Sequence, residues 1–331
     1  MDKNFKRLTL LLLGLFVIGF ATPVNAQEKD LNDAKRAIKK GDQAKRNNNY
    51  EEAIAAFKEC ADISEQLDAD EADELKAVAQ QKFTKTHLDY GNELLTQNEY
   101  DQALEYYNET VKFAKQYDFP DYLNKAENNI PDVYYAQGKN HLSESKYEEA
   151  IEFFNKAIEG DPDYGMAYIR KAQAYGQLGD SDAMEKAVQE ATDIGKKAGE
   201  DEVVNTAQEL AYKYFYNQGA TSLKDKNYAN AIPNLEKALE YGGSPTLNHY
   251  LAICYGQEGQ FENAADREKK AIEALKGEKS DEEMAQYYYR LGTYYEELGQ
   301  TENACSAYGN AAFGKYKENA EYKIEHVLSC Q

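Results

Sequence analysis

The chain has 331 residues and a formal net charge of −21, with 59 Asp and Glu against 38 Lys and Arg. This balance argues against nucleic acid as a partner, because a phosphate backbone is bound by the Lys and Arg that neutralise it. An anionic membrane surface would repel the chain for the same reason. Acidic residues are densest over 62–74, a stretch with seven Asp or Glu and no Lys or Arg. We interpret this stretch as a solvated helix face, with a site for a basic partner as the alternative.

The N-terminus has the features of an export signal. Lys3, Lys6 and Arg7 precede an apolar run over 8–20, and the small residue Ala26 follows at a position that a signal peptidase accepts. The apolar run is too short for a spanning helix, which needs about 20 residues. We therefore predict a signal peptide over the first 26 residues and an exported protein, periplasmic or extracellular, with no membrane span after cleavage. A retained anchor is the alternative.

A recurring spacing of large and small residues outlines helical hairpins. In one segment, counted from Tyr134 as offset 0, the pattern has residues at offsets 0, 3, 4, 7, 16, 20, 23 and 28. These are Tyr134, Gln137, Gly138, His141, Ala150, Phe154, Ala157 and Pro162. The first seven offsets recur further along the chain: Tyr288, Leu291, Gly292, Tyr295, Ala304, Tyr308 and Ala311. Large residues at offsets 0, 3 and 7 share one helix face, and the small residue at offset 4 lets two helices approach closely. The proline ends the second helix.

The small residue at offset 4 predicts seven hairpins: Gly41, Gly91, Gly138, Ala172, Gly219, Ala252 and Gly292. The pattern resembles the tetratricopeptide repeat (TPR), here of an exported bacterial type. The resemblance implies an all-α fold, a right-handed α-solenoid of stacked hairpins. We predict one such domain over 27–331, with a C-terminal capping helix over 314–331 that covers the last hairpin. Glu268 departs from the pattern, because it occupies a position where a bulky apolar residue is expected.

The intervals between hairpins are uneven and indicate insertions ahead of three first helices. The added stretches, 70–85, 121–132 and 201–211, are rich in helix-forming residues. We therefore predict lengthened first helices. A separate short helix before each hairpin is the alternative, and it applies best at Pro131, which should break or kink a helix.

Four cysteines in an exported chain raise the question of disulfides. Cys60 occupies a small core position, where a thiol behaves as a small hydrophobe. Cys305 and Cys330 are the best candidates for a pair. If the chain reverses near Gly314 and continues as a regular helix, however, Cys330 lies roughly 10 Å along that helix from the residue that faces Cys305. That exceeds the limit of about 7 Å on the Cα separation, so we predict that all four thiols are unpaired.

No constellation of residues points to catalysis, a cofactor or a metal. The histidines are scattered over separate hairpins without metal-ligand spacing: His87, His141, His249 and His326. We expect His141 to pack in the core, and we predict that the protein is not an enzyme. Carboxylates are too frequent in so acidic a chain for their pairing to indicate acid–base chemistry.

The resemblance points to the inner wall of the solenoid as the binding surface. In tetratricopeptide repeats, the residue after offset 0 faces the concave groove. Here this column reads Ile38, Leu88, Tyr135, Ile169, Tyr216, His249 and Tyr289. Family members that bind a C-terminal carboxylate use a clamp of lysine and asparagine, of which only Asn92 and Lys139 are possible remnants, so that class of ligand is not favoured.

A tyrosine-lined groove suits an extended peptide or a partner helix, because tyrosine offers a large, rigid surface with a polar end. We therefore predict an exported scaffold that holds a peptide or a partner protein of the cell envelope. The alternative is a protein that binds a small molecule such as a sugar between its tyrosines. A self-filled groove and a self-assembling structural protein remain open, as does the oligomeric state.

Overall fold

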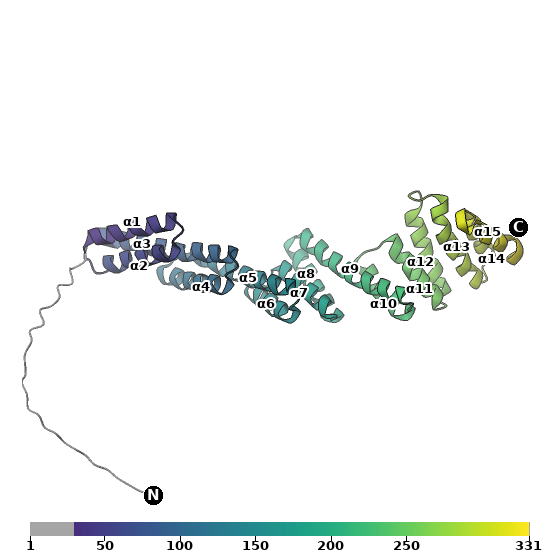
Figure 1. Ribbon diagram of the computed structural model, residues 1–331, viewed down its shortest axis with the longest axis horizontal. Helices are drawn as coiled ribbons and strands as arrows, with labels where there is room; N and C mark the ends of the chain where they lie inside the picture. The colour runs from purple at the N-terminus through teal and green to yellow at the C-terminus, as the bar shows by residue number, and fades with distance from the viewer. Residues whose placement is uncertain (1–29, 331) are drawn as a thin grey trace, which may run out of the picture. The chain divides into compact units, whose positions relative to one another are not determined.

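The computed structural model of the protein describes residues 30–330, so the predicted signal peptide lies outside the described residues. Between them, the described residues form helices and no strand (Figure 1). The first eight are α1 (Leu31–Arg46), α2 (Tyr50–Ser64), α3 (Asp70–Thr96), α4 (Tyr100–Tyr117), α5 (Pro120–Ser143), α6 (Tyr147–Gly160), α7 (Gly165–Leu178) and α8 (Ser181–Ala198). The next six are α9 (Asp201–Lys224), α10 (Tyr228–Tyr241), α11 (Pro245–Gln257), α12 (Phe261–Leu275), α13 (Asp281–Glu297) and α14 (Thr301–Ala311). The chain ends in a 3₁₀ turn (Gly314–Tyr316), α15 (Lys317–Tyr322) and a π-helical turn (Lys323–Val327).

Successive helices pair as hairpins, which confirms the predicted fold class. Direct packing joins α1 to α2, α7 to α8, α9 to α10, α11 to α12 and α13 to α14. Hairpins also pack on their neighbours, since α8 contacts α9, α10 contacts α11 and α12 contacts α13. No helix of the described region is long and apolar enough to cross a membrane.

The chain divides into two compact units. The first comprises the residues up to Tyr90 together with Lys112–Tyr122, and its core joins Phe57 and Phe83 to alanines of α1 and α2. The second comprises Gly91–Val111 and the residues from Leu123 onwards. Its largest core cluster runs from Ile169 on α7 to Ala307 on α14.

Each of the five glycines at offset 4 faces a bulky side chain of its own hairpin, as the spacing predicts. A Cβ built on Gly138 would lie 2.5 Å from the Phe154 ring, and one on Gly292 would lie 2.8 Å from the Tyr308 ring. The same relationship holds at Gly41, Gly91 and Gly219, which face Phe57, Tyr107 and Leu235. Real Cβ atoms do not approach other atoms so closely, so this contact requires glycine.

The insertions extend the first helices, as predicted, and do not form separate short helices. α3 has 27 residues, and α5 and α9 have 24 each. Pro131 lies inside α5 and does not divide it. Its ring packs on Gly160 at the end of α6, where a Cβ would meet the ring carbon Cγ at 2.9 Å. The proline is therefore held by the partner helix of its own hairpin.

The C-terminal segment corrects the prediction of four free thiols. Cys305 and Cys330 form a disulfide with a Cα separation of 5.9 Å, while Cys60 and Cys254 are free and buried. The predicted offset assumed one regular helix after Gly314. The segment instead combines a 3₁₀ turn, the short α15 and a π-helical turn, so its rise per residue differs from that of an α-helix.

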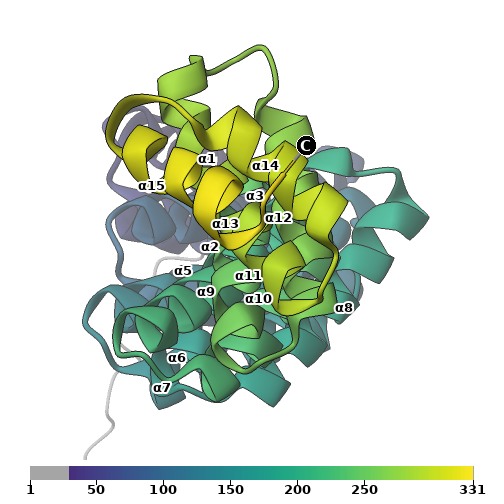
Figure 2. The same ribbon diagram turned by 90° about the vertical axis from the view of Figure 1, so that its right-hand side faces the viewer.

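α15 lies beside the last hairpin at the C-terminal end (Figure 2). Ala320 is fully buried there, in a cluster with Tyr308, while Tyr322 keeps 59% of its surface exposed. Lys323 also forms an ion pair with Glu296 of α13 at 2.7 Å. The segment is thus fastened by a disulfide, an apolar contact and an ion pair.

Candidate functional site

The predicted binding column occupies two kinds of environment. Leu88 and Ile169 are buried, with 4% and 2% of their surface exposed. The remaining members of the column are half-buried: Ile38, Tyr135, Tyr216, His249 and Tyr289. Ile38 and Leu88 belong to the first compact unit and the others to the second. The four half-buried members of the second unit contact different neighbours.

Tyr135 on α5 is covered from two sides. Its ring lies 5.0 Å from that of Tyr164, measured between centroids, and the Nζ atom of Lys139 lies 4.8 Å above it. The Tyr164 hydroxyl donates a hydrogen bond of 2.8 Å to Asp132. Burial and this carboxylate raise the pKa of Tyr164, which stays a neutral donor. Lys139, considered above as a clamp remnant, therefore contacts an aromatic ring of its own helix.

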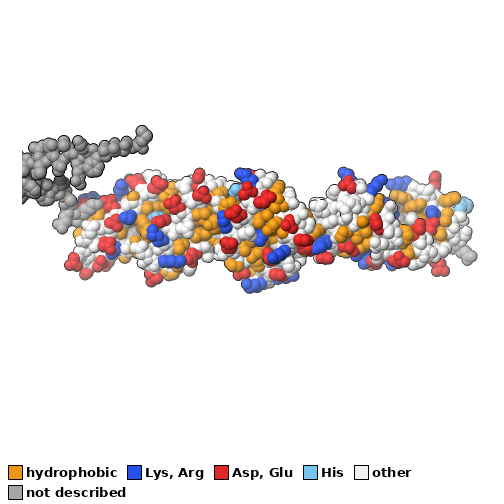
Figure 3. Space-filling view, turned by 90° about the horizontal axis from the view of Figure 1, so that it is seen from below, with side chains coloured by type: hydrophobic (Ala, Val, Ile, Leu, Met, Phe, Trp, Pro, Cys, Tyr) orange, Lys and Arg blue, Asp and Glu red, His pale blue; other side chains and the backbone are white. Residues whose placement is uncertain are grey.

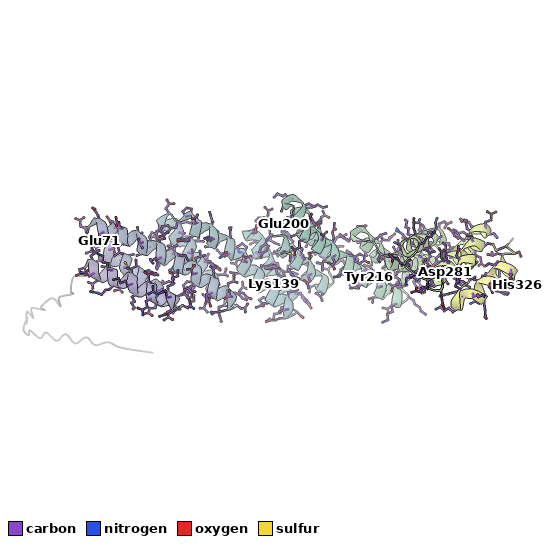
Figure 4. All side chains as sticks on the ribbon, turned by 90° about the horizontal axis from the view of Figure 1, so that it is seen from above. Glu71, Lys139, Glu200, Tyr216, Asp281 and His326 are labelled. Carbon is purple, nitrogen blue, oxygen red and sulfur yellow. A yellow bond between two sulfur atoms is a disulfide. The ribbon has the colours of Figure 1, made fainter. Side chains whose placement is uncertain are left out.

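Tyr216 on α9 stands in the middle of a stack of three tyrosines. Its centroid lies 5.7 Å from Tyr212 and 5.9 Å from Tyr250, with interplanar angles of 19° and 17°. Burial, followed by the neighbouring Tyr250, raises the pKa of Tyr216 to about 12. Figure 4 labels Tyr216 and Lys139, which come from different first helices. Tyr216 thus packs against two tyrosines of its own chain.

His249 on α11 pairs with Glu268 on α12. Its Nδ1 atom lies 2.9 Å from each carboxylate oxygen of Glu268, which is fully buried. Burial raises the pKa of Glu268, and the hydrogen bond from His249 offsets part of that rise. The repeat spacing predicted that His249 faces the groove, and Glu268 departs from that spacing. The signal that could have predicted this pair is a histidine at offset 1, His249, in the same hairpin as an acidic residue at offset 20, Glu268.

Tyr289 on α13 lines an open cleft of about 490 Å³ near the C-terminus, which we call the C-terminal cleft. Its lining comes from α11, α12, α13 and the 3₁₀ turn: Gly256, Gln257, Phe261, Gln286, Tyr289, Arg290, Thr293, Tyr294, Glu297 and Tyr316. One wall is a single face of α13, because its members recur every three or four residues. Sequence reasoning found only Tyr289. The spacing of α13 also places Arg290 and Thr293 on that side, but Tyr316 follows the turn after α14 and has no spacing that reveals it.

Aromatic rings shape the cleft. Tyr289 and Tyr316 lie 5.3 Å apart between centroids, at an interplanar angle of 35°. At the floor, the ring of Tyr294 passes so close to Gly256 that a Cβ there would lie 2.5 Å from it. The Tyr294 hydroxyl donates a hydrogen bond of 3.0 Å to the carbonyl of Ala252. Burial and the nearby Glu268 raise the pKa of Tyr294 to about 12.

Outside the cleft, acidic and basic side chains are interspersed over the visible face (Figure 3). In the acidic stretch over 62–74, lysines pair with several carboxylates: Lys58 with Asp62, Lys76 with Glu65 and Lys35 with Glu71. Exposed pairs of this kind contribute little to stability, roughly 0–1 kcal/mol. They fit the interpretation of this stretch as a solvated surface.

Fold and lining together define a helical-repeat protein with an aromatic cleft near its C-terminus. The family model described as "Tetratricopeptide repeat" matches residues 34–67, 131–164, 167–195 and 285–312. The matched residues lie in both compact units, and the last matched range contains Tyr289 and Arg290 of the cleft.

The chain is also similar to several known proteins. It is 31% identical over 115 residues to the Photosystem I assembly protein Ycf3 of Synechococcus sp. (strain CC9605), covering 33% of this chain. The chain spans 65% of the length of that relative. Among solved structures, YrrB, "a TPR protein with an unusual peptide-binding site", is 20% identical. The match covers 60% of this chain and 88% of the YrrB chain, with a TM-score of 0.28. MamA is 16% identical, and the match covers 61% of this chain and 98% of the MamA chain, with a TM-score of 0.32. At these identities and TM-scores the two structures carry no information on function.

Proposed function

We propose that the protein is an exported scaffold that binds a peptide or a segment of a partner protein, and that the C-terminal cleft is its principal binding site. Proteins built from tetratricopeptide repeats typically bind proteins or peptides. The observation that carries the assignment of the site is the pair Tyr289 and Tyr316, which wall an open cleft from two separate elements. Tyrosines suit this task because they offer rigid contact area at a low cost in conformational entropy.

The form of the cleft favours a peptide. The cleft has a volume of about 490 Å³ and is open to solvent. Gln257 and Gln286 contribute amide groups to its lining. Such groups can hydrogen-bond the backbone of an extended segment, while the rings take up its side chains.

Two features support the proposal of export. One is the N-terminal combination of Lys3, Lys6 and Arg7 with a short apolar run and a small residue at Ala26. The other is the disulfide between Cys305 and Cys330. Disulfides form and persist mainly in oxidising compartments outside the cytosol. Cell fractionation, with measurement of the mass of the mature chain, tests both the location and the cleavage after Ala26.

The test of the binding site compares tyrosines inside and outside the cleft. Tyr289→Ala and Tyr316→Ala are used as baits with the envelope fraction of the source cells, and the captured proteins are identified by mass spectrometry. Tyr322→Ala is the matched control, because Tyr322 lies in the same C-terminal segment but is 59% exposed outside the cleft. We expect each cleft variant to lose about 2 kcal/mol or more of binding free energy and the control to bind normally. Undiminished capture by both cleft variants would refute the assignment of the site.

A further inference from the structure

Arg290 is a half-buried cation in the C-terminal cleft that forms no ion pair with any of the described residues. This is unusual in a chain with 59 Asp and Glu, where the lysines commonly lie against carboxylates. A guanidinium has five N–H donors in a planar fork that matches a carboxylate. The structure leaves the charge of this fork uncompensated at short range.

The acids nearest to Arg290 do not neutralise it. Glu268 is fully buried, and its short contacts are with His249. Arg290 acts on Glu268 only as a nearby charge, which lowers the pKa of that carboxyl against the stronger effect of burial. Glu297 also lines the cleft, but it lies about two helical turns, roughly 10 Å, further along α13. The guanidinium shares a hydrogen bond with the Tyr294 hydroxyl but holds no carboxylate of residues 30–330, so its remaining N–H donors are available to a ligand.

Aromatic rings line the same cleft as Arg290. Tyr289 is its neighbour on α13, Tyr316 faces Tyr289 at 5.3 Å, and Phe261 lines the cleft from the start of α12. A carboxylate that reaches Arg290 therefore comes with a group that contacts these rings. Desolvation by the rings strengthens a charge-assisted hydrogen bond, because the local dielectric constant is lower than that of water.

We propose that the C-terminal cleft recognises a peptide segment in which an Asp or Glu side chain stands next to an aromatic or large aliphatic one, with the carboxylate held by Arg290. This proposal rests on the proposed function and names its ligand class. The net charge of −21 repels an acidic segment at long range. Selection therefore depends on the short-range contact at Arg290, and an acidic segment without an apolar neighbour gains too little to bind.

The experiment is a selection from a library of random peptides displayed as internal loops, which have no free carboxyl terminus. The full exported chain is immobilised as wild type, Arg290→Gln and Arg290→Lys. The matched control is Arg267→Gln, because Arg267 is a half-buried arginine on the adjacent α12 that does not line the cleft. Circular dichroism melts show whether each variant keeps its fold.

We expect the wild type and the Arg267→Gln control to enrich peptides with Asp or Glu beside Phe, Tyr or Leu. Arg290→Gln should still enrich the apolar residues but lose the acidic ones, and its affinity for an enriched acidic peptide should fall about 10-fold or more. Arg290→Lys should restore part of that affinity, since it keeps the charge without the fork.

The contrary outcomes are distinct. Acidic enrichment that persists in Arg290→Gln, or wild-type enrichment of apolar residues alone, overturns the proposal and leaves the peptide-binding function standing. Failure to enrich any peptide overturns the proposed function as well. A free C-terminus is the other source of a carboxylate. Two synthetic peptides separate the sources: one keeps Glu and has an amidated C-terminus, and the other has Gln in place of Glu and a free C-terminus. Equal affinities of the two peptides would overturn the role of the acidic side chain.

Discussion

His249 and Glu268 join the two helices of one hairpin through a hydrogen bond of 2.9 Å from the imidazole Nδ1 to a carboxylate with no exposed surface. Glu268 occupies the offset at which the other hairpins place Phe154, Leu235 or Tyr308, all fully buried. The hairpin of α11 and α12 therefore uses a polar contact where its neighbours use an apolar one.

We predict strong coupling between these two positions. His249→Leu leaves a buried carboxylate without its hydrogen-bond donor and should cost about 3 kcal/mol or more of unfolding free energy. Glu268→Leu leaves an imidazole nitrogen unpaired and should cost about 1–3 kcal/mol. The double variant replaces both polar groups by apolar ones and should lose less than the sum of the single losses. Urea denaturation of the four proteins measures the coupling, and additive losses would contradict it.

The pH dependence of stability should carry the signature of Glu268. Because its pKa in the folded state lies above the ordinary carboxyl value of 4.5, the folded protein holds this proton more tightly than the unfolded chain. The resulting stabilisation is present below about pH 4.5 and is lost as the pH rises through the folded pKa. Glu268→Gln cannot titrate, so its stability relative to wild type should increase over that window.

Urea denaturation of both proteins from about pH 4 to about pH 8 measures this difference. His249 and Arg290 both lower the pKa of Glu268, but the effect of burial is larger. The pKa therefore stays above its ordinary value with both cations present. An equal stability difference at every pH would contradict the predicted titration.

The close contact at Gly292 predicts a position-specific cost for alanine. A Cβ at this residue would lie 2.8 Å from the Tyr308 ring, so Gly292→Ala should overpack the hairpin and lose about 1–3 kcal/mol. The matched control is Gly309→Ala on α14, where a Cβ meets no atom within 4 Å. There alanine should be neutral or stabilise the helix by up to about 1 kcal/mol. Thermal melts of both variants test this difference, and equal shifts in Tm would contradict the predicted overpacking at Gly292.

The disulfide between Cys305 and Cys330 should stabilise the C-terminal segment. The bond closes a loop with a sequence separation of 25, for which chain entropy gives about 3 kcal/mol. A thiol assay in denaturant without reductant should find two free thiols, Cys60 and Cys254. Reduction should lower Tm in the wild type and leave the Cys305→Ser/Cys330→Ser double variant unchanged. Four free thiols in the exported protein would show that the bond does not form.

Breaking that bond should also weaken binding in the C-terminal cleft, because Tyr316 reaches Tyr289 from the segment that the bond fastens. The Lys323–Glu296 ion pair and the burial of Ala320 remain, so the expected effect is a partial loss. Titration of the enriched acidic peptide onto wild type and the Cys305→Ser/Cys330→Ser variant measures it. Equal affinities would show that the cleft keeps its wall without the disulfide.

The sequence by itself determined the helical hairpins of this protein. Residues three and four apart share a helix face, and the resemblance to the tetratricopeptide repeat implied that the face of Gly138 meets that of Phe154, as it does. The same local logic predicted the lengthened α3, α5 and α9, since helix-forming residues continue through each insertion. It also placed Tyr289 among the candidate binding residues. These inferences succeed because helix periodicity is a local property of the chain.

Only the tertiary structure decided the contacts that depend on how irregular turns position distant residues. A 3₁₀ turn and a π-helical turn bring Cys330 to Cys305 and Tyr316 to Tyr289, and neither turn leaves a period in the sequence. The pairing of His249 with Glu268, and the lack of an ion pair between Arg290 and any residue of 30–330, likewise depend on the rotation of α11, α12 and α13 against one another. Periodicity assigns a residue to a face, whereas the packing of neighbouring helices selects its partner.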